Sequence, residues 1–258
     1  MLRFKNLGSG SSGNATVVES HCGTRITRLL VDCGFGLKHL DARLAQAGLL
    51  ANQLDAVFIT HEHGDHVGCV AQLVQRERTP VWMSHGTHAA FGAPDMHGLL
   101  RIARDGVQIE LQGLQIHPFT VPHDAREPLQ LSCTDGAARL GILTDLGHAT
   151  AHVAQQLTGC QGLLLECNHD PDLLAASSYP AFLKKRVGGR LGHLSNPASA
   201  ALARELHHGG LRHLVAAHLS QQNNRPDLAL AALTQALGCS NSDIGVAHAV
   251  HGTPWLTL

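Results

Sequence analysis

The pattern of apolar and polar positions changes between two periods along the chain. Short runs rich in Val, Ile and Leu predict strands, and runs with apolar residues three or four apart predict helices. Strands are predicted at residues 2–7, 15–20, 25–34, 54–60, 80–84, 114–122, 138–145, 162–168 and 213–220. Helices are predicted at residues 37–48, 69–77, 149–157, 197–208 and 226–237, with Asn196 capping the fourth and Pro197 at its first position. Strands joined by short links early, and strands separated by helices later, predict an α/β fold with two sheets between helices.

No repeat, low-complexity tract or Pro-rich linker divides the 258 residues, so we interpret residues 1–258 as one domain. The first residues, MLRFKNLGSG, lack a long apolar segment with a cleavage site. No apolar stretch approaches the roughly 20 residues that span a bilayer. We therefore expect a cytoplasmic protein that does not contact a membrane. The seven cysteines lack CxxC spacing and are expected to be reduced thiols.

The formal net charge of −1 gives the surface no basic excess, so any binding of nucleic acid must be local. Histidine is the unusual residue, with 20 copies against one Tyr and two Trp. Imidazole is the most common metal-ligating side chain. Metal chemistry is therefore the first functional hypothesis.

Three histidines and two acids crowd into HEHGDH (61–66), directly behind a predicted strand. In an extended segment alternate side chains share a face, so His61 and His63 are expected to bind one ion. Asp65 and His66 come at the turn into a helix, which directs them toward a second ion. Burying these groups without compensation would cost several kcal/mol, and coordination compensates all of them. The spacing predicts a site for two metal ions.

The motif THEHGDH behind an apolar strand resembles the metal-binding signature of the metallo-β-lactamase superfamily. The predicted elements are also similar in order to the four-layer αββα sandwich of that superfamily, and the later motifs VPHDA, TDLG and AHLS agree. The resemblance implies one metal on His61, His63 and His123, a second on Asp65, His66 and His218, and Asp145 as the bridge. Such ligands suit two divalent transition ions, Zn or Mn with Fe as a further candidate, better than Mg or Ca. A bridging water would exist as hydroxide near neutral pH, so we predict hydrolysis.

Longer segments resemble a narrower group of that superfamily. The blocks ECNHDPDLL (166–174), YPAFLKKRVGGRLGHLSN (179–196) and AHLSQQNNRPDLA (217–229), with SGSSGN and VPHDAREP, are similar to the YycJ/WalJ-type nuclease-like group. This resemblance covers nearly the whole chain and implies a metal-dependent phosphodiesterase that degrades DNA from its ends as a 5′-to-3′ exonuclease. LQLSCTDG (129–136) departs from the group's usual continuation, which leaves substrate contacts there undefined.

Asp65 and His193 are the expected catalytic residues. His193 precedes a predicted helix, whose free N–H groups favour a phosphate. In related tRNA-processing nucleases such a His lies beside the scissile phosphate, so by resemblance His193 steadies the phosphorane charge or protonates the leaving oxygen. The expected substrate-binding residues are Lys184, Lys185, Arg186, Arg190, His169, Asn223, Asn224 and Arg225. Aromatic residues are scarce, which argues against a broad stacking surface for single strands.

Three questions stay open at the level of sequence. The segment GSGSSGN (8–14) is either a tight turn or a loop whose backbone N–H groups contact an anion. A binuclear hydrolase of a small ester, thioester or lactone is the alternative enzyme, but it would not use the basic segment KKRVGGR. A non-catalytic metal-dependent scaffold is the third function, although all seven candidate ligands are present. The physiological metal, the choice of DNA over RNA and the oligomeric state are not defined.

Overall fold

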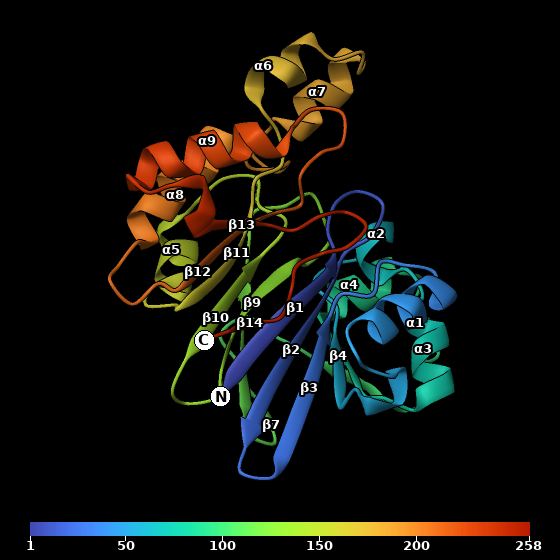
Figure 1. Ribbon diagram of the computed structural model, residues 1–258. Coiled ribbons are helices and arrows are strands. Elements are labelled where there is room, and N and C mark those ends of the chain that lie inside the picture. Colours follow the sequence, from blue (N-terminus) through green and yellow to red (C-terminus); the bar gives the residue numbers. More distant parts are fainter.

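Two seven-stranded sheets face each other, with helices on both outer faces, in the computed structural model, which describes residues 1–258 (Figure 1). This αββα arrangement confirms the predicted fold class. The first sheet has the order β14 (Leu256–Thr257), β1 (Leu2–Gly8), β2 (Ala15–Cys22), β3 (Arg25–Val31), β4 (Ala56–Phe58), β5 (Val81–Met83) and β6 (Leu100–Ile102). The second has the order β13 (Ile244–Val246), β12 (His213–Ala217), β11 (Gly162–Glu166), β10 (Arg139–Leu143), β9 (Leu129–Thr134), β8 (Leu114–Thr120) and β7 (Ile109–Leu111). The interpretation of the chain as one domain stays a prediction.

Nine helices connect or flank these strands. They are α1 (Leu37–Gln46), α2 (Gly64–Val67), α3 (Val70–Glu77), α4 (His85–Ala90), α5 (Ala151–Leu157), α6 (Pro171–Ala176), α7 (Ala181–Val187), α8 (Asn196–Leu206) and α9 (Pro226–Leu237). None of them has the length and apolar character needed to cross a membrane.

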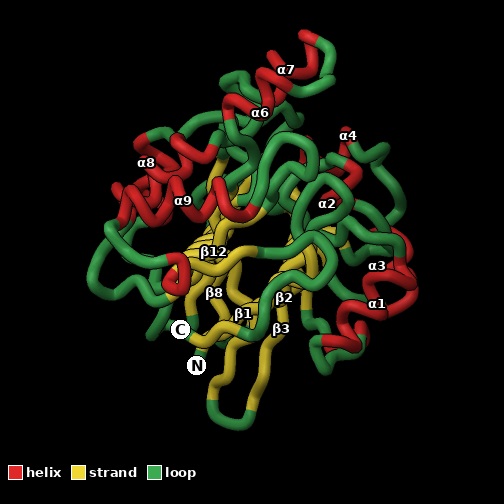
Figure 2. Tube along the Cα trace, turned by 45° about the horizontal axis from the view of Figure 1, so that its top comes forward, coloured by secondary structure: helices red, strands yellow, loops and turns green.

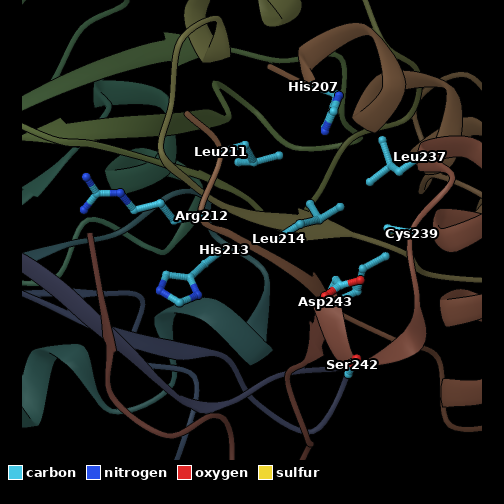
Figure 3. Close-up of a pocket in the computed structure, with 10 residues that line it drawn as sticks. His207, Leu211, Arg212, His213, Leu214, Leu237, Cys239, Ser242 and Asp243 are labelled. Atoms are coloured by element: carbon cyan, nitrogen blue, oxygen red, sulfur yellow. The ribbon is translucent and has the colours of Figure 1, made fainter. Parts of the chain in front are cut away.

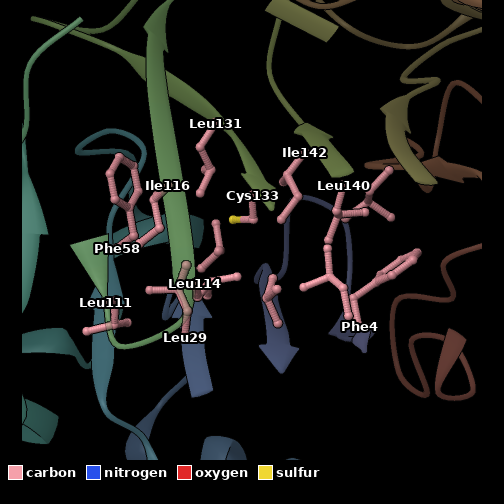
Figure 4. Close-up of a cluster of buried hydrophobic side chains, with 14 of the residues drawn as sticks. Phe4, Leu29, Phe58, Leu111, Leu114, Ile116, Leu131, Cys133, Leu140 and Ile142 are labelled. Carbon is pink, nitrogen blue, oxygen red and sulfur yellow. The ribbon is translucent and has the colours of Figure 1, made fainter. Parts of the chain in front are cut away.

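The alternation of side chains along each strand divides the core into three layers. In β3, Leu29 and Val31 pack into the cluster between the sheets, whereas Leu30 packs into the cluster under α1 and α3. Figure 4 shows side chains of both sheets meeting in the central cluster, among them Phe4 and Leu140. A third cluster lies between the second sheet and the helices α5, α8 and α9. In Figure 2 the helices α8 and α9 and the helices α1 and α3 flank the strands on opposite sides.

Some elements differ from those expected from the sequence. LQLSCT, which had no predicted structure, forms β9 and pairs antiparallel with β8 and β10. The basic segment KKRVGGR (184–190), for which no helix or strand was predicted, begins within α7. Together with α6, this helix projects from the sandwich (Figure 1). The prediction of Asn196 as a helix cap is wrong, because Ser195 is the cap and its hydroxyl accepts a hydrogen bond from the Ala198 N–H.

Five strand ends meet at one edge of the sandwich. The strands β10, β11 and β12 run parallel in adjacent positions, so their carboxyl ends lie side by side. Strand β8 runs in the same direction as β10, because β9 is antiparallel to both. The loops that follow β4 and β8 also reach this edge. Side chains at the carboxyl ends of parallel strands therefore lie close together in space although they are far apart in the sequence.

Candidate metal centre

The seven predicted metal ligands come together at this edge. His61, His63, Asp65 and His66 follow β4 and enter α2, and one later ligand follows each of β8, β10 and β12. These three later ligands are His123, Asp145 and His218. His61, His66, His123, Asp145 and His218 are buried, with exposed fractions of 4% or less.

The donor atoms form two adjacent groups. In the first, His63 Nδ1 lies 3.0 Å from His61 Nε2 and 3.3 Å from His123 Nε2. In the second, Asp65 Oδ2 lies 3.6 Å from His66 Nε2 and 3.4 Å from His218 Nε2. These six donor residues therefore lie in two neighbouring groups of three.

Asp145 lies between the two groups. Its Oδ2 is 3.1 Å from His66 Nε2, and its Oδ1 is 3.7 Å from His123 Nε2. Oδ1 also lies 3.4 Å from His218 Nδ1, so this carboxylate is within reach of residues of both groups.

Outer hydrogen bonds orient the ligating imidazoles. Asp32 Oδ2 accepts from His66 Nδ1 at 2.8 Å, and the Gly192 carbonyl accepts from His123 Nδ1 at 2.9 Å. The hydroxyl of Thr60 lies 3.0 Å from His61 Nδ1 and donates to Asp32. Each of these imidazoles therefore carries its proton on Nδ1 and turns the lone pair of Nε2 inward, the arrangement typical of metal-ligating histidines.

The donor set fits divalent cations. The ring nitrogens that face one another at 3.0–3.3 Å need a shared proton or a cation among them. Asp145 Oδ2 is buried and makes no hydrogen bond of good geometry, which also requires a positive partner. Imidazole and carboxylate donors together suit divalent ions such as Zn.

The pKa values of His61 and Asp145 favour the forms in which these two groups bind a metal. Burial and the neighbouring His66 hold the pKa of His61 well below its ordinary value, so its ring stays neutral. Burial raises the pKa of Asp145, but the surrounding imidazoles outweigh burial and hold this pKa well below its usual range. Neutral imidazole and ionised carboxylate are the forms that bind metals.

Glu166, at the end of β11, was missed by the sequence analysis although it opens the block ECNHDPDLL. Its Oε1 accepts from His193 Nδ1 at 2.7 Å and lies 3.3 Å from His218 Nδ1. Its Oε2 accepts from the backbone N–H groups of Leu146 and Leu194. This carboxylate therefore joins the predicted catalytic histidine to a predicted metal ligand. The available signal was its position: Glu166 lies near the end of a predicted strand, as Asp145 and His218 do, so it was a candidate for the same site.

His193 is partly exposed toward the site, with 21% of its side chain accessible. Burial would lower the pKa of His193, but the charge and hydrogen bond of Glu166 and the charge of Asp145 raise it above its ordinary value. The Nδ1 atom is engaged by Glu166, so Nε2 is the atom available to a substrate.

The loop at residues 8–14 supports the centre from the other side. Asn14 Nδ2 donates to Asp65 Oδ2 at 3.2 Å, and Ser9 Oγ accepts from the His218 N–H at 2.7 Å. This second bond holds His218 at φ 54°, a left-handed conformation that is uncommon for a residue with a side chain. Neither Asn14, Ser9 nor Asp32 was predicted, because their roles depend on distant segments.

A pocket of about 260 Å³ opens above the two groups. It is lined by Ser11, His63, Gly64, Asp65, Asp124, Asp145, Arg186, Val187, Gly192, His193 and His218. Only Val187 among these is an apolar side chain of any size, so the pocket is polar and suited to a charged ligand.

Among the predicted substrate-binding residues, the basic segment lies nearest the pocket. Arg186 lines it and pairs with Asp124 at 2.5 Å. Lys184 donates to the Ala175 carbonyl, Lys185 is exposed, and the guanidinium of Arg190 lies 3.4 Å from His148 Nε2.

The other four predicted substrate residues are not part of the pocket lining. His169 and Asn223 are buried, and the buried Asn224 amide donates to the Cys167 carbonyl and to Asn196 Oδ1. Arg225 is exposed and pairs with Asp227. These residues support loops near the centre, and a substrate contact by any of them stays a prediction.

A larger cavity, of about 440 Å³, lies elsewhere, between α8, α9 and the strands β12 and β13. Its lining includes His207, His213 and Asp243, but Figure 3 shows these side chains spread around the cavity. No metal-compatible group of donor atoms forms there. Histidine content and size alone therefore do not make a metal centre.

Comparison with known proteins agrees with this geometry. The sequence model of the metallo-β-lactamase superfamily matches residues 8–164. Exodeoxyribonuclease YycJ of Bacillus anthracis is 30% identical, covering 98% of this chain and 95% of its own. Exodeoxyribonuclease WalJ of Streptococcus pneumoniae is 31% identical, covering 98% of this chain and 94% of its own.

A solved structure has the same fold along the whole chain. The metallo-β-lactamase fold protein YhfI of Bacillus subtilis superposes with a TM-score of 0.77 at 17% identity, covering 99% of this chain and 98% of its own. Sheet order, donor geometry and full-length similarity thus agree, and the chain belongs to the metallo-β-lactamase superfamily of hydrolases, within its YycJ/WalJ-type group.

Proposed function

We propose that this hydrolase is a binuclear metal-dependent phosphodiesterase that degrades DNA from its ends in the 5′-to-3′ direction. The observation that carries the proposal is the position of Arg186 and His193 at a polar pocket directly above seven convergent metal donors. The similarity of nearly the whole chain to two proteins named exodeoxyribonucleases supports the same substrate.

His61, His63 and His123 would hold one ion, Asp65, His66 and His218 the other, and Asp145 both. Zn or Mn ions there would supply an activated water and positive charge for the phosphate. The chain itself contributes the orientation of the ligands, through Asp32, Thr60 and the Gly192 carbonyl. Asp65 lines the pocket, and Asn14 orients its carboxylate by donating a hydrogen bond to Oδ2.

His193 is the proposed general acid. Glu166 fixes its ring through Nδ1 and favours the protonated form, so Nε2–H is available to donate to the leaving sugar oxygen. Glu166 is a positioning residue in this scheme, because it acts through His193 and touches no substrate. Arg186 would bind a phosphate of the same strand after exchanging its partner Asp124 for that phosphate.

The alternative function, hydrolysis of a small thioester, lactone or ester, has less support. Such substrates need an apolar pocket for the acyl part, and this pocket offers only Val187. Positive charge from Arg186 would also have no use there.

The test is Mn-dependent degradation of 5′-phosphorylated, 3′-labelled DNA by the wild type and by Asp65→Ala. We expect mononucleotides from the wild type alone. A matched control, Asp95→Ala, removes an exposed acid whose side chain contacts only His97 and should retain the activity. If the metal-loaded wild type releases no nucleotide from DNA but hydrolyses a thioester, the phosphodiesterase proposal is wrong.

A further inference from the structure

The helices α6 and α7 form an arm, residues 170–192, that projects above the metal centre. Figures 1 and 2 both show these two helices standing apart from the sandwich. The base of the arm is built into the site. The Gly192 carbonyl accepts from the metal-ligand residue His123, and the His193 N–H donates to the Val187 carbonyl.

The carboxyl end of α7 is packed tightly at this base. A Cβ atom on Gly192 would lie 2.1 Å from the Arg186 carbonyl oxygen, so only glycine permits the approach. The Lys184 ammonium also ties α7 to α6 through the Ala175 carbonyl. The helix is therefore held in a fixed direction, with one end at the pocket and the other pointing away from it.

Phe182 lies at the outer end of α7 and is unusually exposed. Its exposed fraction is 74%, the largest among the exposed large apolar residues of the chain. The chain has few aromatic residues, yet its single Tyr, Tyr179, and this exposed Phe are three positions apart on the arm. A single exposed apolar residue is common on protein surfaces, so the significance of this ring depends on the basic residues that lie beside it.

The ring and the basic residues share one helix surface. Phe182 and Arg186 are four positions apart, which places them on the same face of α7, about 6 Å apart along its axis. That separation is roughly two steps of a stacked strand at about 3.4 Å per nucleotide. Lys185 and Arg190 add exposed positive charge with no acid between residues 173 and 204.

We propose that Phe182 stacks on a nucleobase of the DNA strand whose phosphate is bound at Arg186. This inference rests on the proposed function and adds the contact that recognises a nucleic acid base. Basic residues alone would bind any polyanion, whereas an aromatic face beside them selects a flexible strand with bases. One stacking residue is consistent with the absence of a broad aromatic surface.

The experiment measures steady-state degradation of 5′-phosphorylated single-stranded DNA by the wild type, Phe182→Ala and Phe182→Trp. Leu50→Ala, which removes another exposed side chain outside the arm, is the matched control. A second substrate carries abasic nucleotides near its 5′ end. Metal content is measured for every protein.

We expect Phe182→Ala to raise KM for ordinary DNA about 5- to 100-fold, with a smaller change in kcat, and Phe182→Trp to restore KM. Abasic DNA should raise KM for the wild type and add little further in Phe182→Ala. A KM for Phe182→Ala within twofold of the Leu50→Ala value overturns the inference.

Two other results also decide the matter. If light scattering shows that Phe182→Ala dissociates a wild-type dimer, Phe182 is a contact between copies and the stacking inference is wrong. If the metal-loaded wild type degrades no DNA at all, the proposed function itself fails, which is distinct from degradation that is insensitive to Phe182.

Discussion

Glu19 and Asp145 are two buried carboxylates with opposite surroundings. Glu19 is 0% exposed and accepts hydrogen bonds from Arg3 at 2.7 Å and Arg28 at 2.8 Å, and His21 lies against the same carboxylate. Asp145 is 1% exposed, but its neighbours are imidazoles and no Lys or Arg pairs with it. Its Oδ2 also lacks a hydrogen bond of good geometry.

The difference separates a structural ion cluster from a binding site. The charge of Glu19 is compensated by permanent cations of the chain itself, so that region is complete. The charge of Asp145 faces the titratable rings of His66, His193 and His218, and an imidazole gives up its extra proton when it binds a metal ion. Whether a buried acid belongs to a binding site is therefore indicated by its partners and not by its burial.

Asp145→Asn should give the largest effect. The amide keeps the shape of the side chain but loses the charge shared by the two groups, so we expect DNA degradation to fall by about 10³-fold or more. Metal content should fall in parallel while circular dichroism stays that of the wild type. Retention of both ions and of activity would mean that Asp145 does not bridge the groups.

Asp32→Asn tests the outer hydrogen bonds and should have an intermediate effect. Loss of the charged acceptor for His66 Nδ1 is expected to weaken metal affinity about 10- to 100-fold. Competition with a chelating dye measures this affinity. Asp41→Asn, which breaks only a surface pair with Arg76, is the control and should leave the affinity unchanged. Equal metal affinities in the wild type, Asp32→Asn and Asp41→Asn would show that Asp32 does not support metal binding.

Glu19→Gln should affect stability and not metal binding. Burial raises the pKa of Glu19, but hydrogen bonds from His21, Arg28 and Arg3 outweigh burial and lower it below its ordinary value. A lowered pKa stabilises the fold above the unfolded-state pKa of about 4.3, and this contribution is lost as the pH falls through the folded-state pKa.

Urea unfolding of the chelated proteins measures the effect. At pH 7 we expect the variant to be less stable by about 2 kcal/mol. The difference from the wild type should narrow as the pH falls below about 4.3. A difference that is the same at pH 7 and at pH 3.5 would contradict the role of the Glu19 charge.

His207→Ala, in the larger cavity, should have the smallest effect. Its ring belongs to no convergent donor group, so metal content and activity should stay at wild-type values. The free energy of unfolding should change by no more than about 0.5 kcal/mol. A loss of bound metal in this variant would show that histidines outside the edge of the sandwich also bind.

The sequence predicted those parts of the site that are local or follow the superfamily pattern. His61, His63, Asp65 and His66 are contiguous, so their geometry depends on one strand end and one helix start. Glu166 and Asp32 were missed because their contacts depend on how strands align in the two sheets.

Other outcomes depended on packing that no local pattern reveals. Asn223 and Asn224 carry polar side chains typical of a surface, but they are buried as supports of neighbouring loops. The basic segment was recognised by charge alone. In the structure this segment begins within a helix whose carboxyl end packs against Gly192 and whose first turn carries the exposed Phe182.

The most direct test of the two-group centre is a count of metal ions per chain by mass spectrometry after loading with Zn and dialysis. His63→Ala removes a donor from the first group only, and His218→Ala removes a donor from the second only. We predict about two ions in the wild type and about one in each folded variant. One ion or none in the wild type, or two in both variants, would contradict a binuclear centre built from these seven residues.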